Sequence, residues 1–181
     1  MIDEVYYEFD AEASFAWLLD SFDNVILVRS FSKGFGLAGL RFGYLASAPA
    51  NIAQLDKLRG PWDVNALAAR LVTVALDRGD WLDFMPALLA GRELLRRCLL
   101  DAGFDVPPSQ TNFVVARHPN ARAIAAWLAG QGVLVADLGD YPDAQGILAQ
   151  CLRIAVPSAS ERDLVHGLLQ HAPRACGEGV S

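Results

Sequence analysis

The chain has 181 residues, which is enough for one domain or two small ones. Its net charge of −6 argues against a nucleic-acid partner, because no basic stripe is present to meet phosphates. No apolar run approaches the roughly 20 residues of a membrane-spanning helix, and the acidic start "MIDEVYYEFD" lacks the pattern of a signal peptide.

Three segments near the start of the chain predict strands of a sheet. The segment "IDEVYYEF" (2–9) is rich in β-branched and aromatic residues. The segment "NVILVRS" (24–30) is a continuous apolar run, which is typical of a strand covered on both faces. The segment "LRFGYLAS" (40–47) predicts a third strand.

Helices are predicted in the middle of the chain. Pro49 begins a short helix, which the following "RGPW" ends. Apolar residues recur at helical spacing over 63–78, with Asp63 as the N-cap. A longer helix is predicted from about 81 to 102, and Gly103 ends it.

The pattern then changes to that of a small α+β unit. A helix over 121–132 is closed by glycines, and Ser158 or Ser160 caps a last helix that runs through Leu169. The strands expected in this part of the chain are "TNFVVAR" (111–117), "VLVADL" (133–138) and "CLRIAVP" (151–157).

Together these patterns predict an α/β fold in three parts. We expect pieces of a doubly covered α/β sheet in residues 1–48, connecting helices in 49–94 and a small α+β domain in 95–175. The cysteines lack CxxC spacing, so we expect reduced thiols in a cytoplasmic protein, with neither a disulfide frame nor a metal site. The three histidines are expected to be solvated: His118, His166 and His171.

One of the two lysines of the chain stands in an unusual setting. Lys33 follows an apolar strand within "SFSKGFGLAGLRFGY", and the glycines after it allow a ligand to approach the backbone closely. Ser30, Ser32 and Arg41 add hydroxyl groups and a guanidinium, which suit the binding of a phosphate. The P-loop pattern GxxxxGK[ST] is absent from the sequence. Two kinds of site remain, a nucleotide site or a Schiff base between lysine and pyridoxal phosphate (PLP).

The start of the chain favours the PLP site. "DEVY" places Asp3 and Tyr6 near the same sheet edge as the lysine. A carboxylate facing the pyridine nitrogen of PLP keeps that nitrogen protonated, and a phenol can hydrogen-bond the 3′ oxygen. Taken singly, Asp3 and Tyr6 are weak signals, since an aspartate at a strand end is usually a cap or turn residue. The same holds for Arg153 in the later segment "CLRIAVP", where an arginine is usually an ordinary charge at the edge of a sheet.

The segments "DEVYYEF", "RSFSKGFGLAGLRFGY", "TNFVVAR" and "LRIAVP", in this order, resemble the fold-type I PLP enzymes and more narrowly the histidinol-phosphate aminotransferase group. The resemblance covers nearly the whole chain. It implies C-terminal strands of a large PLP-binding domain in 1–48 and a small C-terminal domain in 95–175. Members of the group have roughly another half chain before "DEVYYEF", so the resemblance implies the C-terminal half of an enzyme, weakly active or inactive alone.

The resemblance also implies a role for each candidate residue of the cofactor site. Lys33 forms the Schiff base with PLP, Asp3 pairs with the pyridine nitrogen and Tyr6 with the 3′ oxygen. The cofactor phosphate is held by Ser30, Ser32 and Arg41.

For the substrate site, the resemblance implies that Arg153 clamps the α-carboxylate and that Asn112 lines the same region. The implied activity transfers an amino group from a phosphorylated donor similar to histidinol phosphate to 2-oxoglutarate, within amino-acid biosynthesis, in an enzyme that is homodimeric when complete. No arginine stands near Ala136 and no glycine follows Arg153 in "VPS", where the family often has them, so the substrate stays open. Two alternatives remain, a threonine-phosphate decarboxylase and a non-catalytic fragment.

Overall fold

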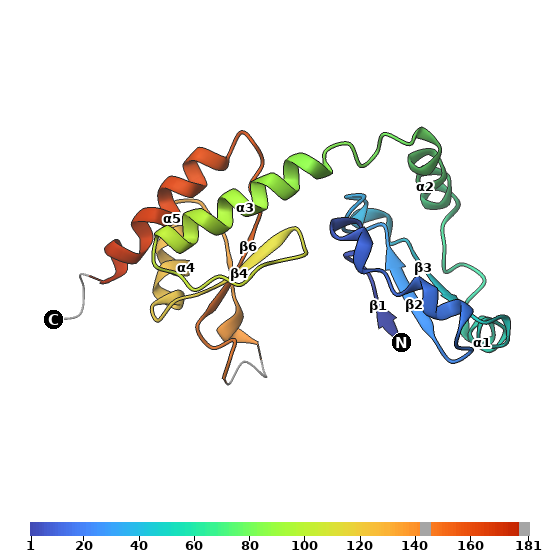
Figure 1. Ribbon diagram of the computed structural model, residues 1–181. Helices are drawn as coiled ribbons and strands as arrows, with labels where there is room; N and C mark the ends of the chain where they lie inside the picture. The colour runs from blue at the N-terminus through green and yellow to red at the C-terminus, as the bar shows by residue number, and fades with distance from the viewer. Residues whose placement is uncertain (142–145, 178–181) are drawn as a thin grey trace. The chain divides into compact units, whose positions relative to one another are not determined.

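The structure is a computed structural model that describes residues 1–141 and 146–177. The chain divides into two compact units, Met1–Met85 and Pro86–Ser181, and each is described by itself. Figure 1 shows the elements of both units in chain order.

The first unit contains a three-stranded sheet in the order β1-β2-β3. Its strands are β1 (Ile2–Asp3), β2 (Ile26–Ser30) and β3 (Gly43–Ser47), so the second and third predicted strands are confirmed with shorter bounds. β1 is parallel to β2, and β3 is antiparallel to it. The carboxyl ends of β1 and β2 and the amino end of β3 therefore lie at the same edge of the sheet.

The predicted strand 2–9 is wrong beyond Asp3. The backbone turns there, because the amide of Val5 donates to the Asp3 carboxylate at 3.0 Å and the amide of Tyr7 donates to the Glu4 carbonyl at 3.0 Å. Three short 3-10 helices then lead to β2: η1 (Tyr7–Phe9), η2 (Ala11–Ala13) and η3 (Ala16–Asp20).

The expectation of a strand covered on both faces is not met by β2. Among the described residues of this strand only Leu27 is buried. The physical reason is the narrowness of the sheet, since β1 contributes only two residues beside it. Apolar side chains of β3 are also exposed, Tyr44 and Leu45 among them.

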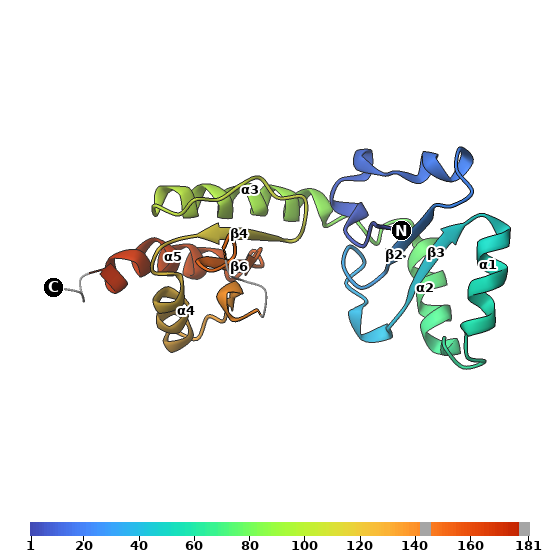
Figure 2. The same cartoon turned by 90° about the horizontal axis from the view of Figure 1, so that it is seen from below.

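Helix α1 (Pro49–Leu55) begins at the predicted proline and runs alongside β3 (Figure 2). A 3-10 turn, η5 (Asp56–Leu58), follows it. The next helix, α2 (Ala66–Arg78), starts later than predicted, because its N-cap is Asn65 and not Asp63. The Asn65 side chain accepts from the amide of Ala68 at 2.7 Å, whereas Asp63 accepts from the amide of Gly60 at 2.9 Å.

In the second unit, helix α3 (Met85–Asp101) ends before Gly103, as predicted, and Gly103 adopts a φ of 88°. The helix begins at Met85 and not at Trp81, because residues 81–84 form a turn in which the amide of Met85 donates to the carbonyl of Leu82 at 2.9 Å. No described helix is both long and apolar enough to cross a membrane.

A second three-stranded sheet has the order β4-β6-β5, with antiparallel pairing throughout. Its strands confirm the three predicted ones with shorter bounds: β4 (Phe113–Arg117), β5 (Ala136–Asp137) and β6 (Cys151–Ala155). Helix α4 (Ala121–Gly130) follows β4, and the 3-10 helix η6 (Leu138–Asp140) follows β5.

The last helix, α5 (Arg162–Gly177), is longer than the predicted one. Leu169 and Ala172 are both fully buried, so its apolar face continues past the expected end, and Pro173 is accommodated inside it. Glu161 precedes the helix, so neither Ser158 nor Ser160 is its N-cap. The Ser158 hydroxyl instead donates to the Glu161 carboxylate at 2.6 Å.

One face of the second sheet packs into a buried cluster with α3, α4 and α5. Leu152 and Ile154 of β6 point into this cluster, and Arg153 between them is exposed. This is the alternation expected for a strand with one covered face. The largest members of the cluster that are less than 2% exposed are Leu95, Leu99, Val106, Val114, Ile124, Leu128, Leu152 and Leu169.

Candidate functional site

The shared edge of the first sheet brings several predicted site residues to one end of the unit. Asp3 ends β1 and Ser30 ends β2, and Ser30 pairs with Gly43 at the start of β3. Lys33 lies in the turn after β2, and Arg41 lies just before β3. This placement follows from the parallel pairing of β1 with β2, because parallel strands end at the same edge.

The turn that carries Lys33 is closed by backbone hydrogen bonds. The amide of Gly36 donates to the Lys33 carbonyl at 3.0 Å, and the amide of Leu37 donates to the Phe31 carbonyl at 3.0 Å. Gly36 has a φ of 67°, a conformation that favours glycine. The Lys33 side chain itself is exposed.

An aromatic cluster fixes the base of this turn. Phe31 is buried, with its ring centroid 4.9 Å from that of Phe35 and 5.5 Å from that of Phe42, both in edge-to-face arrangements. Tyr44 adds a third ring at 5.9 Å. Such pairs stabilise a fold beyond simple burial, so the backbone around Lys33 is anchored although its sequence is rich in glycine.

Lys33 and Tyr6 are brought together. The Nζ atom of Lys33 lies 5.6 Å from the centroid of the Tyr6 ring. An ammonium group at this distance from the ring is attracted by its electrons. The Tyr6 ring in turn lies 5.9 Å from the ring of buried Phe9.

Ser30, Ser32 and Arg41 line one cavity of about 810 Å³, whereas Asp3, Tyr6 and Lys33 do not. The Ser30 hydroxyl accepts from the amide of Ser32 at 3.1 Å. Arg41 is exposed, has a φ of 53°, and donates from Nη1 to the Ala38 carbonyl at 3.0 Å. The rest of the lining includes apolar side chains from β3 and α1, such as Leu45, Ile52 and Leu55.

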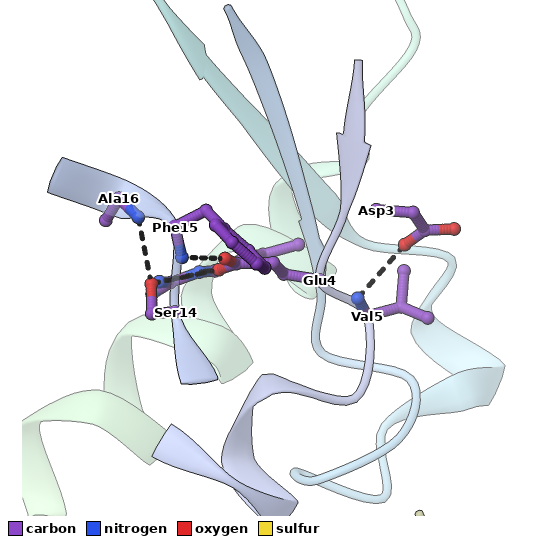
Figure 3. Close-up of polar contacts among 7 residues, drawn as sticks. Asp3, Glu4, Val5, Ser14, Phe15 and Ala16 are labelled. Carbon is purple, nitrogen blue, oxygen red and sulfur yellow. Dashed lines mark hydrogen bonds and ion pairs between the residues drawn. The ribbon is translucent and has the colours of Figure 1, made fainter. Parts of the chain in front are cut away.

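The two acidic residues at the end of β1 point in different directions. Figure 3 shows the Asp3 carboxylate turned back toward the amide of Val5 and the Glu4 carboxylate turned toward Ser14 and Phe15. Asp3 is exposed, and the Glu4 side chain is only 7% exposed. Asp3 is therefore the carboxylate available at the sheet edge, and Glu4 has a structural environment.

Glu4 forms a largely buried ion pair with Arg29, which was not predicted from the sequence. One carboxylate oxygen, Oε2, accepts from Nε and Nη2 of Arg29 at 3.1 and 3.0 Å. The other oxygen accepts from the amide of Phe15 at 2.6 Å, and the Ser14 hydroxyl bridges both side chains. The signal available in the sequence was the charged Arg29 inside the apolar run "ILVRS".

The surroundings of Arg29 keep its charge in place. Burial acts to lower the pKa of Arg29, but hydrogen bonds with Tyr44 and with Glu4 outweigh it, and the pKa rises. The guanidinium carbon also lies 3.7 Å from the centroid of the Tyr7 ring. Because Glu4 follows Asp3 and Arg29 precedes Ser30, this pair joins the two strand ends that carry candidate site residues.

Arg153 and Asn112 belong to the second unit. Arg153 stands in the middle of β6, paired with Val115 and Ala136, and its guanidinium carbon lies 5.0 Å from the centroid of the Phe113 ring. The Asn112 carbonyl accepts from the amide of Val156 at 3.0 Å. Arg153 is exposed on the face of the sheet opposite the buried cluster, so its guanidinium is open to a ligand.

The expectation of solvated histidines is wrong for two of the three. His118 is partly buried, its Nδ1 accepts from the amide of Asn120 at 3.1 Å, and burial lowers its pKa. The Nε2 atom of His166 is buried without a hydrogen-bond partner among the described residues, and burial is the main cause that lowers its pKa. His171 is exposed.

Cysteines and metal ligands give no further site. Within residues 1–141 and 146–177, no group of histidine, cysteine, aspartate and glutamate is arranged to hold a metal ion. All three cysteines are free thiols, and Cys98 and Cys151 are buried.

Comparison with known proteins identifies relatives along almost the whole chain. The family model for aminotransferase class I and II matches residues 1–170. Histidinol-phosphate aminotransferase 1 of Ralstonia nicotianae is 37% identical over 168 residues, which cover 89% of this chain and 42% of that protein. Histidinol-phosphate aminotransferase of Rhodopirellula baltica is 33% identical over 175 residues, covering 95% and 47%.

Solved structures show the same likeness. The crystal structure of histidinol-phosphate aminotransferase from Sinorhizobium meliloti in complex with pyridoxal-5′-phosphate superposes with a TM-score of 0.82 at 30% identity. The match covers 96% of this chain and 48% of that one. The chain thus spans about half the length of the curated relatives it matches.

Proposed function

The chain belongs to the class I and II aminotransferase family, and from this premise we propose that it serves PLP-dependent amino-group transfer. The proposed donor is a phosphorylated amino compound similar to histidinol phosphate, and the proposed acceptor is 2-oxoglutarate. One observation carries the proposal: the pairing of β1, β2 and β3 gathers Asp3, Lys33 and Arg41 at one sheet edge. A cytoplasmic location and a homodimeric complete enzyme belong to the same proposal.

The residues present at this edge fit the chemical groups of PLP. A phosphate requires hydroxyl and guanidinium donors, and Ser30, Ser32 and Arg41 line a common cavity. A pyridine nitrogen requires a carboxylate, and Asp3 is exposed at the end of β1. An aldehyde requires an accessible amine, and Lys33 is exposed in the neighbouring turn. The donor set therefore agrees with the cofactor that the family uses.

Each residue then has a proposed task. When bound, PLP supplies an electron sink for the carbon that loses its proton. The Lys33 amine would hold the cofactor and would move the proton at the α-carbon of the substrate. Asp3 keeps the ring nitrogen protonated, and Tyr6 donates to the 3′ oxygen. The three phosphate-binding residues orient the ring.

The exposed guanidinium of Arg153 suits the substrate α-carboxylate, because arginine binds a carboxylate through two parallel hydrogen bonds. Phe113 supports the guanidinium from the adjacent strand. Asn112 is proposed to line the same site, since it precedes Phe113 at the start of β4.

The first test is chemical labelling. The protein is incubated with excess PLP and reduced with borohydride, and the modified peptides are identified by mass spectrometry. We expect modification at Lys33, with Lys57 as an internal control because it is the other lysine and is also exposed. Labelling of Lys57 in preference to Lys33 would contradict the proposal, and no labelling above background would favour the non-catalytic alternative.

The second test measures the reaction, on the longest product of the same gene, with histidinol phosphate and 2-oxoglutarate. Formation of glutamate at the rate of substrate loss supports amino-group transfer. Release of carbon dioxide from threonine phosphate, without glutamate, would support the decarboxylase alternative instead.

A further inference from the structure

Glu8 is a partly buried acidic residue to which the proposed reaction gives no task. It lies in η1, between Tyr7 and Phe9, and its Oε2 atom is buried without a hydrogen-bond partner in the described part of the chain. A buried polar atom in this state costs free energy. The contacts of the Glu8 side chain should therefore explain why this cost is tolerated.

The Glu8 side chain packs against the glycine that follows Lys33. A Cβ atom placed on Gly34 would lie 2.6 Å from Cβ of Glu8 and 2.7 Å from its Oε2. Gly34 is buried although the neighbouring Lys33 is exposed. The side chain of Glu8 thus fills the space beside Gly34 and prevents the turn from moving in that direction.

A second contact holds the next residue of the turn. The indole Nε1 of Trp81 donates to the carbonyl of Phe35 at 2.8 Å, from a segment 46 residues further along the chain. This hydrogen bond is partly buried. Glu8 and Trp81 therefore fix two successive positions, Gly34 and Phe35, directly after Lys33.

We propose that Glu8 and Trp81 are positioning residues for the Lys33 turn (residues 31–37), which hold it so that the lysine side chain points to the sheet edge. The inference rests on the proposed function for its purpose but on separate contacts for its evidence. Neither residue touches the reacting atoms. Both act through the backbone on either side of the peptide group that joins Gly34 to Phe35.

The shape of the Glu8 side chain matters here more than its charge. Burial is the main cause that raises the pKa of Glu8, and it outweighs the opposite effects of a hydrogen bond from its own backbone and of the charge of Arg29. Glutamine has nearly the same shape as glutamate, so it keeps the contact with Gly34 while it removes the charge. Glu8→Gln is therefore expected to preserve the turn, and Glu8→Ala to release it.

The test begins with hydrogen exchange in the absence of PLP, so that it does not depend on the proposed function. The reporters are the amides of Gly36 and Leu37, which are hydrogen-bonded within the turn. We expect Glu8→Ala and Trp81→Phe each to speed exchange of these amides by about tenfold, and Glu8→Gln to leave it within about twofold. The matched controls are Glu12→Ala and Trp62→Phe, because both side chains are exposed in the same unit.

A double variant checks the contact itself. Gly34→Ala is expected to speed exchange in the turn, because the new methyl group meets Glu8. Combining it with Glu8→Ala removes the obstacle, so the two changes together are expected to disturb the turn less than the sum of their separate effects. Additive effects on the exchange rates would show that the Glu8 side chain does not contact Gly34.

The second readout is the ratio of PLP labelling at Lys33 to that at Lys57. Glu8→Ala is expected to lower this ratio about tenfold, and Glu8→Gln is expected to leave it as in the unaltered protein. General unfolding would instead raise labelling at both lysines. If Lys33 is not labelled in the unaltered protein, the proposed function fails, and the exchange data still decide the positioning. Unchanged exchange in Glu8→Ala and Trp81→Phe, or equal effects of Glu8→Ala and Glu8→Gln, would overturn the inference.

Discussion

We predict that Glu4→Ala lowers the free energy of unfolding of the first unit by about 3–5 kcal/mol, the usual loss when one partner of a buried ion pair is removed. The side chains of Glu4 and Arg29 are only 7% and 16% exposed, so solvent screens their interaction little. Without Glu4, Arg29 keeps its charge in this environment, and the amide of Phe15 loses its acceptor.

The assay is urea unfolding followed by tryptophan fluorescence. Trp127 is replaced by phenylalanine in every variant, because Trp17, Trp62 and Trp81 then report the first unit alone. With a slope of about 2 kcal/mol per molar urea, the midpoint is expected to fall by about 2 M. The matched control is Asp56→Ala, whose ion pair with Arg59 is 55% and 60% exposed and is expected to contribute less than about 1 kcal/mol.

The explanation is tested by a second variant. Replacing both partners, by Glu4→Leu with Arg29→Met, is expected to recover most of the stability, since apolar side chains of similar size leave no buried charge. A loss below about 1 kcal/mol in Glu4→Ala would refute the claim that the pair joins β1 to β2. A double variant as unstable as Glu4→Ala would assign the loss to packing and not to the uncompensated charge.

Three further predictions concern single residues. Arg41→Gly is expected to raise stability by up to about 1 kcal/mol, because its φ of 53° favours glycine, while it weakens PLP retention measured by equilibrium dialysis; unchanged retention would remove Arg41 from the phosphate site. Arg153→Lys is expected to raise KM for the amino donor and lower kcat/KM at least about tenfold, and unaltered kinetics would argue against a role in carboxylate binding. Burial lowers the pKa of His118 below its usual 6.5, so the unfolded chain binds more protons, and this contribution to stability is full above pH 6.5 and is lost as the pH falls below it. Thermal unfolding of His118→Asn, which keeps an acceptor for the amide of Asn120, should therefore vary less between pH 7 and pH 5 than that of the unaltered protein, and an identical pH profile would contradict the assignment.

Local sequence patterns predicted the elements that depend on local interactions. The apolar run over 24–30 became β2, and the glycine at 103 marked the end of α3, because both signals act within a few residues. The N-cap of α2 was placed two residues early, since Asp63 and Asn65 both carry a suitable acceptor and only the tertiary structure decides between them. Boundaries of this kind depend on competition between neighbours.

The contacts that shape the candidate site could not be predicted in the same way. Glu4 and Arg29 are 25 residues apart, and Trp81 and Phe35 are 46 residues apart. Nothing in the spacing of these residues indicates that they meet. A candidate lysine can thus be found from its immediate neighbours, whereas the residues that position it depend on the pairing of strands and on packing between distant segments.

The segment "DEVYYEF" provides both kinds of residue within seven positions. Asp3 is exposed at the sheet edge, and the Tyr6 ring centroid lies 5.6 Å from the Nζ atom of Lys33. Glu4 is joined to Arg29, and Glu8 packs against Gly34, so these acidic residues connect the segment to β2 and to the turn after it. Removing the negative charge at Glu4 or at Asp3 should therefore have opposite effects. Glu4→Gln should lower the free energy of unfolding and alter PLP binding only as far as β1 is disturbed. Asp3→Asn should leave the free energy of unfolding nearly unchanged and weaken PLP binding. If urea unfolding and PLP titration gave the same ranking for the two variants, the separation between structural and cofactor-binding carboxylates in this segment would be wrong.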